Sequence, residues 1–397
     1  MKKVSLKRSP ILYNTEELIL VSARKDLNDK LIKKAERLIR EGVDWERFCY
    51  LAIKSQAGVL VYNSLKVIAL INCIPQDVFD KLRTAYSCVI LSAAGQHKKA
   101  TDLLKLLAIK DIAAIPLKGT FLSKRIYGDI ESRGASVDID IFIRWKDRSA
   151  AHTVLIENGY LFRPAEEFES WLWQENYIGP GHQIIDVIYD IWLRGFRREA
   201  VAGLWNGTIR TADSDGFTYS EFGDEELIIH MFQGLVTSDN GYKCLRYICD
   251  INEFLERHSR SLNWESVINK AKKWRLRGSV YTAISLAGDL FNSNVPSSVI
   301  NDIRPSFFKR VFIKAFFNRK VMLRENFRRR LMDSFLSYIF FELIEAASFS
   351  EYRAIIKRVF FPPPEVLGIK DGDPRPLRLR YSTRILKGMF KVLTLQK

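Results

Sequence analysis

The stretch from Asp111 to Arg144, DIAAIPLKGTFLSKRIYGDIESRGASVDIDIFIR, decides the fold that we predict for this chain. It ends in residues 137–143, VDIDIFI, in which every odd-numbered position is apolar. Such alternation is typical of a strand with one face in the core, and it places Asp138 and Asp140 together on the other face. Carboxylates at i and i+2 lie roughly 7 Å apart, near enough to share a pair of divalent cations.

A possible phosphate-binding turn precedes this strand. The short apolar run 112–117 reads as a strand, Lys118, Gly119 and Thr120 follow it, and a helical pattern begins at residue 121. A helix N-terminus offers backbone N–H groups to phosphate oxygens, and glycine lets a ligand approach the backbone closely. The sequence therefore predicts a turn that binds phosphate groups, with Lys118 adding positive charge.

The order of these motifs resembles the uncharacterised nucleotidyltransferase family of the polymerase-β-like superfamily. The matching residues are Leu117-Lys118-Gly119, Tyr127, Arg133, Asp138-Ile139-Asp140 and a helix ending in Asn158-Gly159-Tyr160. The resemblance implies a nucleoside triphosphate such as ATP as substrate, and two Mg²⁺ ions, with Mn²⁺ as an alternative, held by three carboxylates. It also implies that the nucleotide is bound by Lys118, Gly119, Thr120 and Arg133.

In this family the third carboxylate comes from a neighbouring strand, which the resemblance matches to residues 183–192, QIIDVIYDIW. Asp186 occupies the place of the third ligand. Asp190 is the competing candidate because it shares the same strand face by parity, but Asp186 is the residue that aligns. Asp138, Asp140 and Asp186 are therefore predicted as the catalytic and metal-binding residues. Since they would share two cations, we expect the Asp138 and Asp186 carboxylates to lie within about 10 Å of each other.

Composition restricts the class of protein. The chain has 397 residues, of which 47% are apolar and 27% charged, as in an ordinary folded soluble protein. The formal net charge is +16, and residues 304–330 hold ten Lys or Arg against the single acid Glu325. Such a charge favours nucleotides, nucleic acid or anionic lipid as partners.

Cysteine usage and hydropathy indicate a cytoplasmic protein. The five cysteines are odd in number and include no Cys-x-x-Cys pair, so neither a disulfide framework nor a zinc site is predicted. The N-terminus has no apolar signal region, and no apolar run reaches about 18 residues, which predicts neither signal peptide nor membrane span.

The predicted fold class is α+β. The resemblance implies a polymerase-β-like nucleotidyltransferase core, a small mixed sheet with flanking helices, at residues 111–215, between a helical region expected at 1–110 and a helical region with a basic tail expected at 216–397. About four helices are expected between residues 16 and 107, and a crossover helix at 148–158. Asp44 and Asn263 are expected to cap similar helix pairs. The aromatic segment 162–181 is expected to form a loop or hairpin over the site.

Further site candidates are less specific. The resemblance brings in Lys243, Arg246 and Asp250 from the helical half, although a solvated helix face with ordinary ion pairs explains them equally well. His182 suits a proton relay or a phosphate contact, but an ordinary loop histidine is the favoured interpretation. No Ser-His-Asp or Cys-His arrangement is visible in the sequence.

Two functions from different classes follow. In the first, the protein transfers a nucleoside monophosphate to an acceptor hydroxyl or phosphate and releases pyrophosphate; sugar phosphates, peptide or protein side chains, small molecules and RNA ends remain open as acceptors. In the second, a catalytically inactive triphosphate-binding or scaffold protein contacts an anionic partner through its basic C-terminal helices. The basic aromatic stretch 307–330 fits a solvated amphipathic helix best, with an anionic surface or nucleic acid as alternatives.

Overall fold

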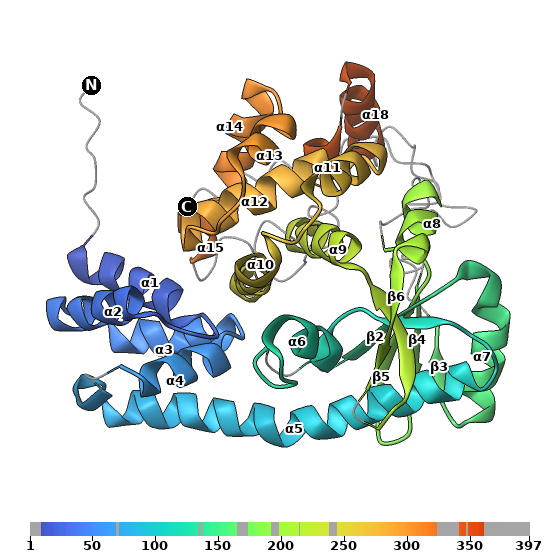
Figure 1. Cartoon of the computed structure of the whole chain (residues 1–397), viewed down its shortest axis with the longest axis horizontal. Helices are drawn as coiled ribbons and strands as arrows, with labels where there is room; N and C mark the ends of the chain where they lie inside the picture. The colour runs from blue at the N-terminus through green and yellow to red at the C-terminus, as the bar shows by residue number, and fades with distance from the viewer. Residues whose placement is uncertain are drawn as a thin grey trace, which may run out of the picture.

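A computed structural model shows a mixed α and β protein in which two small sheets are flanked by helices (Figure 1). It describes residues 9–68, 71–133, 136, 138–164, 174–191, 198–213, 215–237, 244–323, 341–346 and 348–360. Predictions that concern Lys243, Trp192, residues 165–173, the basic stretch beyond 323 and the tail beyond 360 lie outside these residues.

The N-terminal region is helical, as predicted. Its elements are α1 (Pro10–Ser22), α2 (Asp29–Glu41), α3 (Trp45–Lys54), α4 (Gly58–Lys66), a 3₁₀ turn (Ile71–Cys73) and α5 (Gln76–Ala108). The described part thus holds five α-helices rather than about four. Gly42 (φ 101°) follows the end of α2 and Pro75 caps the start of α5, so helices are interrupted at a glycine and at a proline. Helix α5 is 33 residues long, and it runs from the N-terminal helices to the sheet (Figure 1).

The larger sheet has the strand order β1-β2-β5-β4-β3. Its strands are β1 (Ala114–Pro116), β2 (Asp138–Ile143), β3 (Leu161–Arg163), β4 (Gln174–Ile178) and β5 (Ile184–Ile188), joined in part by α6 (Gly119–Tyr127) and α7 (Arg148–Glu157). Strands β2 and β5 are parallel, whereas the other pairs are antiparallel. The predicted crossover helix is confirmed as α7, and the sheet is mixed, as expected.

The two faces of β2 differ as the alternation predicted. Ile139, Ile141 and Ile143 are buried in a core that includes apolar residues of α5 and α7. On the opposite face, Phe142 is also buried, and its ring stacks on Trp205 with 5.0 Å between ring centroids. Only the start of β2 therefore keeps polar side chains on that face.

A helix and a hairpin after the sheet were not predicted. Helix α8 (Arg198–Asn206) leads into β6 (Thr208–Ala212) and β7 (Thr218–Phe222), which pair as a separate two-stranded sheet. Polar and apolar residues mix in both strands, so the period-two pattern is weak. The hairpin crosses residue 215, where the sequence placed the end of the core, and β7 packs against β1.

The C-terminal region is helical, as expected. Its described helices are α9 (Asp224–Thr237), α10 (Cys244–His258), α11 (Trp264–Lys273), α12 (Arg277–Phe291), α13 (Ser297–Asp302), α14 (Phe307–Phe316), α15 (Arg319–Met322) and α18 (Phe349–Phe360). Asp44 caps α3 through Arg47 N and Asn263 caps α11 through Ser266 N, which confirms both predicted caps. None of the described helices is long and apolar enough to cross a membrane.

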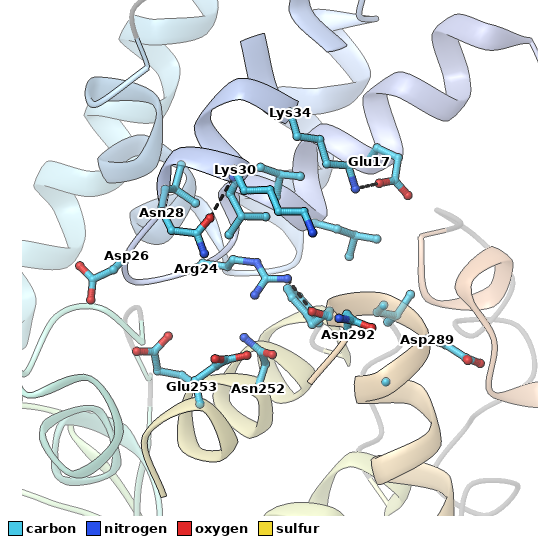
Figure 2. A pocket seen from close by; sticks show the side chains of 18 of the residues that line it. Glu17, Arg24, Asp26, Asn28, Lys30, Lys34, Asn252, Glu253, Asp289 and Asn292 are labelled. Atoms are coloured by element: carbon cyan, nitrogen blue, oxygen red, sulfur yellow. Dashed lines mark hydrogen bonds and ion pairs between the residues drawn. The ribbon is translucent and has the colours of Figure 1, made fainter. Parts of the chain in front are cut away.

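Apolar residues of α1–α4 and of α9–α12 share one core, so the two helical regions pack together. A cavity of about 940 Å³ lies between α1 and α2 on one side and α10, α12 and α15 on the other. Charged side chains from both regions line it: Glu17, Arg24, Asp26, Lys30, Lys34, Glu253, Glu256, Arg257, Asp289 and Arg319. Figure 2 shows Arg24 between the two sides, with its guanidinium bonded to the carbonyl oxygen of Phe291 at 2.8 Å. The five acidic and five basic side chains balance in charge, so the lining of this cavity is strongly polar.

Candidate functional site

The three predicted acids meet on one face of the adjacent strands β2 and β5. Asp140 lies directly opposite Asp186 in the parallel register, and Asp138 lies two residues earlier on the same face. One carboxylate oxygen from each of the three lies within 4.8 Å of the others. This is well inside the limit of about 10 Å expected for carboxylates that share two cations. The predicted convergence is therefore confirmed.

Asp140 shows why this cluster suits a cation. Its side chain is buried, and Oδ1 accepts a hydrogen bond from Lys118 Nζ at 3.2 Å. Its other oxygen, Oδ2, is also buried and has no hydrogen-bond partner among the described residues. A buried carboxylate oxygen without a partner is costly. Because carboxylate oxygens are the ligands that Mg²⁺ and Mn²⁺ prefer, the donor set fits a divalent cation.

The predicted turn lies directly beside the acids. Gly119 begins α6 with a φ of 66°, in the left-handed region that favours glycine. Leu117 N donates to the carbonyl oxygen of Asp140 at 3.0 Å, which connects the turn to β2. Burial would lower the pKa of Lys118, but the Asp140 and Asp138 carboxylates raise it well above its usual value, so the ammonium stays charged.

Arg133 connects α6, which the turn begins, to α10. It is 2% exposed, and its Nε donates to Asp250 Oδ2 of α10 at 2.7 Å. Tyr127 of α6 donates to the other oxygen of Asp250 at 2.9 Å, and Ser123 Oγ accepts from Arg133 N at 3.1 Å. Arg133 Nη1 is buried without a hydrogen-bond partner among the described residues. Arg133 is thus held to α10 by a buried ion pair and to α6 by a hydrogen bond.

Two further basic groups lie near Arg133. His230 of α9 is buried, and its pKa is lowered to about 3 by burial and by the charges of Lys118 and Arg133, so the ring is neutral at physiological pH. Burial and the charge of Arg133 lower the pKa of Arg246 to about 10, and Arg246 bonds to Gln56. Arg246 and Asp250 are therefore buried residues rather than members of a solvated helix face.

Sequence reasoning missed residues that contact the site from α5 and from the segment after β6. His97 Nδ1 lies 3.0 Å from Thr120 Oγ1, and His97 Nε2 lies 3.2 Å from Asp213 Oδ2. Gln96 donates to the carbonyl oxygen of Ser136, whose hydroxyl donates to Asp138 Oδ1 at 2.7 Å. A Thr-His-Asp arrangement thus exists in space, although its members are scattered in the sequence.

The sheet register places Asn176 next to the acid cluster, and it separates Asp186, which belongs to the cluster, from Asp190, which does not. Asn176 of β4 pairs opposite Asp186, so an amide lies beside the cluster, a position that only the register reveals. Asp190 lies beyond the end of β5 and is not among the three clustered acids. His182 is exposed in the turn before β5, with a φ of 62°. No signal in the sequence alone identifies Asn176.

The fold and the site define a mixed α and β protein with a cluster of acids, suited to a divalent cation, beside a glycine turn at a helix N-terminus. A family model described as an uncharacterised nucleotidyltransferase matches residues 41–292, well over half of the chain, and the chain belongs to this family. No curated protein and no solved structure matches it. Family membership and the acid cluster together support nucleotidyl transfer with a nucleoside triphosphate as substrate.

Proposed function

We propose that the protein transfers a nucleoside monophosphate from a nucleoside triphosphate to an acceptor hydroxyl or phosphate by two-metal chemistry, on a polymerase-β-like core. The observation that carries this proposal is the convergence of Asp138, Asp140 and Asp186, with one buried oxygen of Asp140 lacking a hydrogen-bond partner among the described residues. All of the proposed site residues lie within 111–215, the proposed core, with helical regions at 1–110 and 216–397 on either side.

The proposed roles follow from the positions of the side chains. Asp138, Asp140 and Asp186 would hold two Mg²⁺ ions, and Asp186 would also take up the acceptor's proton. Bound cations supply charge neutralisation at the α-phosphorus and activation of the acceptor oxygen. The acceptor oxygen forms a bond to the α-phosphorus, the bond from the α-phosphorus to the bridging oxygen of the β-phosphate breaks, and pyrophosphate leaves.

The turn residues are assigned to the leaving group. Lys118, Gly119 and Thr120 would hold the β- and γ-phosphates through the charged amine and the first N–H groups of α6. Arg133 is assigned to the same subsite as a buried support of α6, since its guanidinium is paired with Asp250 and its backbone N–H donates to Ser123 Oγ. The acceptor stays open among sugar phosphates, peptide or protein side chains, small molecules and RNA ends.

Isothermal titration with each nucleoside triphosphate, with and without Mg²⁺, followed by a pyrophosphate-release assay over a panel of acceptors, tests the proposal. We expect Mg²⁺-dependent binding of at least one triphosphate and release of pyrophosphate with one acceptor class. Binding without release across the whole panel would favour the inactive triphosphate-binding or scaffold protein. The presence of all three acids argues for the enzyme.

Two substitutions test the turn. Gly119→Val places a branched side chain where the triphosphate should approach, and Lys118→Ala removes a charged hydrogen bond worth on the order of 1.5–3 kcal/mol. We expect a strong loss of triphosphate affinity in the first and a loss of roughly ten- to a hundredfold in the second. Lys118→Ala should keep its affinity for divalent cations, because Asp140 loses only the Lys118 ammonium, which competes with them for the carboxylate.

Lys110→Ala is the matched control, since Lys110 is an exposed lysine just after α5. Its triphosphate dissociation constant should stay close to that of the parent protein. If both turn variants bind triphosphate as tightly as the parent at equal Mg²⁺, the nucleotide binds elsewhere.

An exposed face of α14 supports a role for anionic surfaces as partners. Phe307, Phe308 and Val311 are 64%, 84% and 53% exposed, and the same helix, FFKRVFIKAF, carries three basic residues. Basic helices with exposed aromatic side chains bind anionic lipid interfaces. We propose such a surface as a partner and expect the protein to sediment with phosphatidylserine vesicles but not with pure phosphatidylcholine vesicles. If a Phe308→Ser variant sediments with phosphatidylserine vesicles as well as the parent does, α14 does not form the contact.

A further inference from the structure

Two consecutive residues of α5, Gln96 and His97, contact the two halves of the proposed site separately. His97 reaches Thr120 in the phosphate turn, and Gln96 reaches Ser136, next to β2. Neither residue belongs to the segment 111–191 that carries the acids and the turn. We propose that His97 is a positioning residue for triphosphate binding and that Gln96 is a positioning residue for the metal site. This inference rests on the proposed function.

The side chain of His97 is held in place by its neighbours. Asp213, which accepts from His97, is 8% exposed and also accepts from Lys124 Nζ of α6 at 2.6 Å. Its backbone N–H donates to the carbonyl oxygen of Phe217 at 2.7 Å. The His97 ring packs on Phe121 of α6, with 4.7 Å between centroids. These contacts fix the ring from α6 and from the segment after β6, and such supporting contacts are what hold a functional group in place.

The hydrogen bonds assign a role to each nitrogen of His97. As an ionised carboxylate bonded to Lys124, Asp213 can only accept, so Nε2 carries a proton. The other nitrogen, Nδ1, then accepts a hydrogen bond from the Thr120 hydroxyl, with 3.0 Å between Nδ1 and Oγ1. Thr120 is 5% exposed and is the second residue of α6, whose first N–H groups face the proposed phosphates. His97 therefore sets the position of the turn without touching the nucleotide.

Gln96 acts on the start of β2, where Asp138 lies. The Gln96 amide donates to the carbonyl oxygen of Ser136, and the Ser136 hydroxyl donates to Asp138 Oδ1 at 2.7 Å. That bond fixes the direction in which the Asp138 carboxylate presents its oxygens. Partners that orient a metal ligand in this way typically contribute 10- to 100-fold to metal affinity. Losing the Gln96 contact should therefore weaken cation binding rather than direct nucleotide contacts.

A matched set of variants separates the role of His97 from that of Gln96. His97→Gln keeps an amide near the Nε2 position and loses the Thr120 contact, whereas His97→Asn keeps an amide near the Nδ1 position. We expect His97→Gln to raise the triphosphate dissociation constant about tenfold, as for one lost hydrogen bond, and His97→Asn to raise it much less. Both should leave Mn²⁺ affinity in the absence of nucleotide unchanged.

Gln96→Ala should show the reverse pattern. We expect Mn²⁺ affinity, measured by electron paramagnetic resonance without nucleotide, to fall roughly tenfold, with Ser136→Ala giving a similar loss. Triphosphate binding at saturating Mn²⁺ should stay close to that of the parent. Two neighbouring residues would then produce two separable defects, which a general loss of packing around α5 cannot do.

A double-mutant cycle tests the link between His97 and Thr120. Thr120→Val removes the hydroxyl, so adding His97→Gln to it should cost no further triphosphate affinity, whereas in Thr120→Ser, which keeps the hydroxyl, His97→Gln should still cost its full effect. Additive losses would overturn the proposal, and so would equal losses of Mn²⁺ affinity, triphosphate affinity and melting temperature in every variant. If His97→Gln fails to fold, the Thr120→Val and Thr120→Ser pair still reports on the hydroxyl.

The parent protein decides between the two levels of the proposal. If it binds neither Mn²⁺ nor any triphosphate, the proposed function fails and takes this inference with it. If it binds both and the His97 and Gln96 variants bind them equally well, this inference alone is wrong.

Discussion

Replacing Asp138 with asparagine is expected to abolish turnover while the melting temperature stays unchanged or rises. Asparagine keeps an oxygen that accepts from Ser136 Oγ, but it removes one of three negative charges whose oxygens lie within 4.8 Å of one another. Repulsion between the acids is therefore relieved, whereas cation binding is lost. Since a bound cation stabilises the transition state by several kcal/mol and each 1.36 kcal/mol is tenfold in rate, we expect a loss of about a thousandfold or more.

Asp190→Asn is the matched control for this experiment. Asp190 was the competing candidate for the third acid, and it lies two residues beyond the end of β5. Turnover of this variant should remain close to that of the parent protein. Pyrophosphate release and thermal melting together make the test, and a large drop in melting temperature in Asp138→Asn would mark Asp138 as a structural residue instead.

Removing Arg133 should have the largest effect on stability. The side chains of Arg133 and Asp250 are 1% and 2% exposed, and Arg133→Ala would leave the Asp250 carboxylate buried without its cation. Breaking a buried pair from one side costs about 3–5 kcal/mol, because the remaining charge is uncompensated. We expect a decrease of that size in the free energy of unfolding measured in urea.

Lys98→Ala serves as the control because the Lys98–Asp102 pair on α5 is exposed, at 77% and 54%. Exposed pairs contribute about 0–1 kcal/mol. Combining Arg133→Met with Asp250→Leu should recover part of the lost stability, since neither charge of the pair is then left buried without the other. If Arg133→Ala unfolds at the same urea concentration as the parent but loses triphosphate affinity, Arg133 is a direct ligand of the nucleotide rather than a buried support.

Local patterns predicted the elements around the site well. The alternation in residues 137–143 placed the acids opposite Ile139 and Ile141, and the structure shows that arrangement. Gly119 at the start of α6 has the positive φ for which glycine is favoured. These features depend on neighbours within a few residues, and for that reason the sequence reveals them.

Features that depend on distant segments were not predictable in the same way. The β6–β7 hairpin has weak alternation, and its place beside β1 is set by packing. His97 and Asp213 meet although 116 residues separate them, and Arg133 and Asp250 meet across 117 residues. A histidine in a helix or an aspartate in a loop carries no local pattern that marks its partner. Only the fold brings these groups together.

The measurement that tests the central claim most directly is anomalous diffraction from crystals grown with Mn²⁺ and a triphosphate analogue that cannot be cleaved at the α,β-position. The prediction is two Mn²⁺ peaks between Asp138, Asp140 and Asp186, about 3.5–4 Å apart as in two-metal sites, with the β- and γ-phosphates at Lys118 and Gly119. Anomalous peaks elsewhere, or none at these acids while the triphosphate is bound at another place, would contradict it.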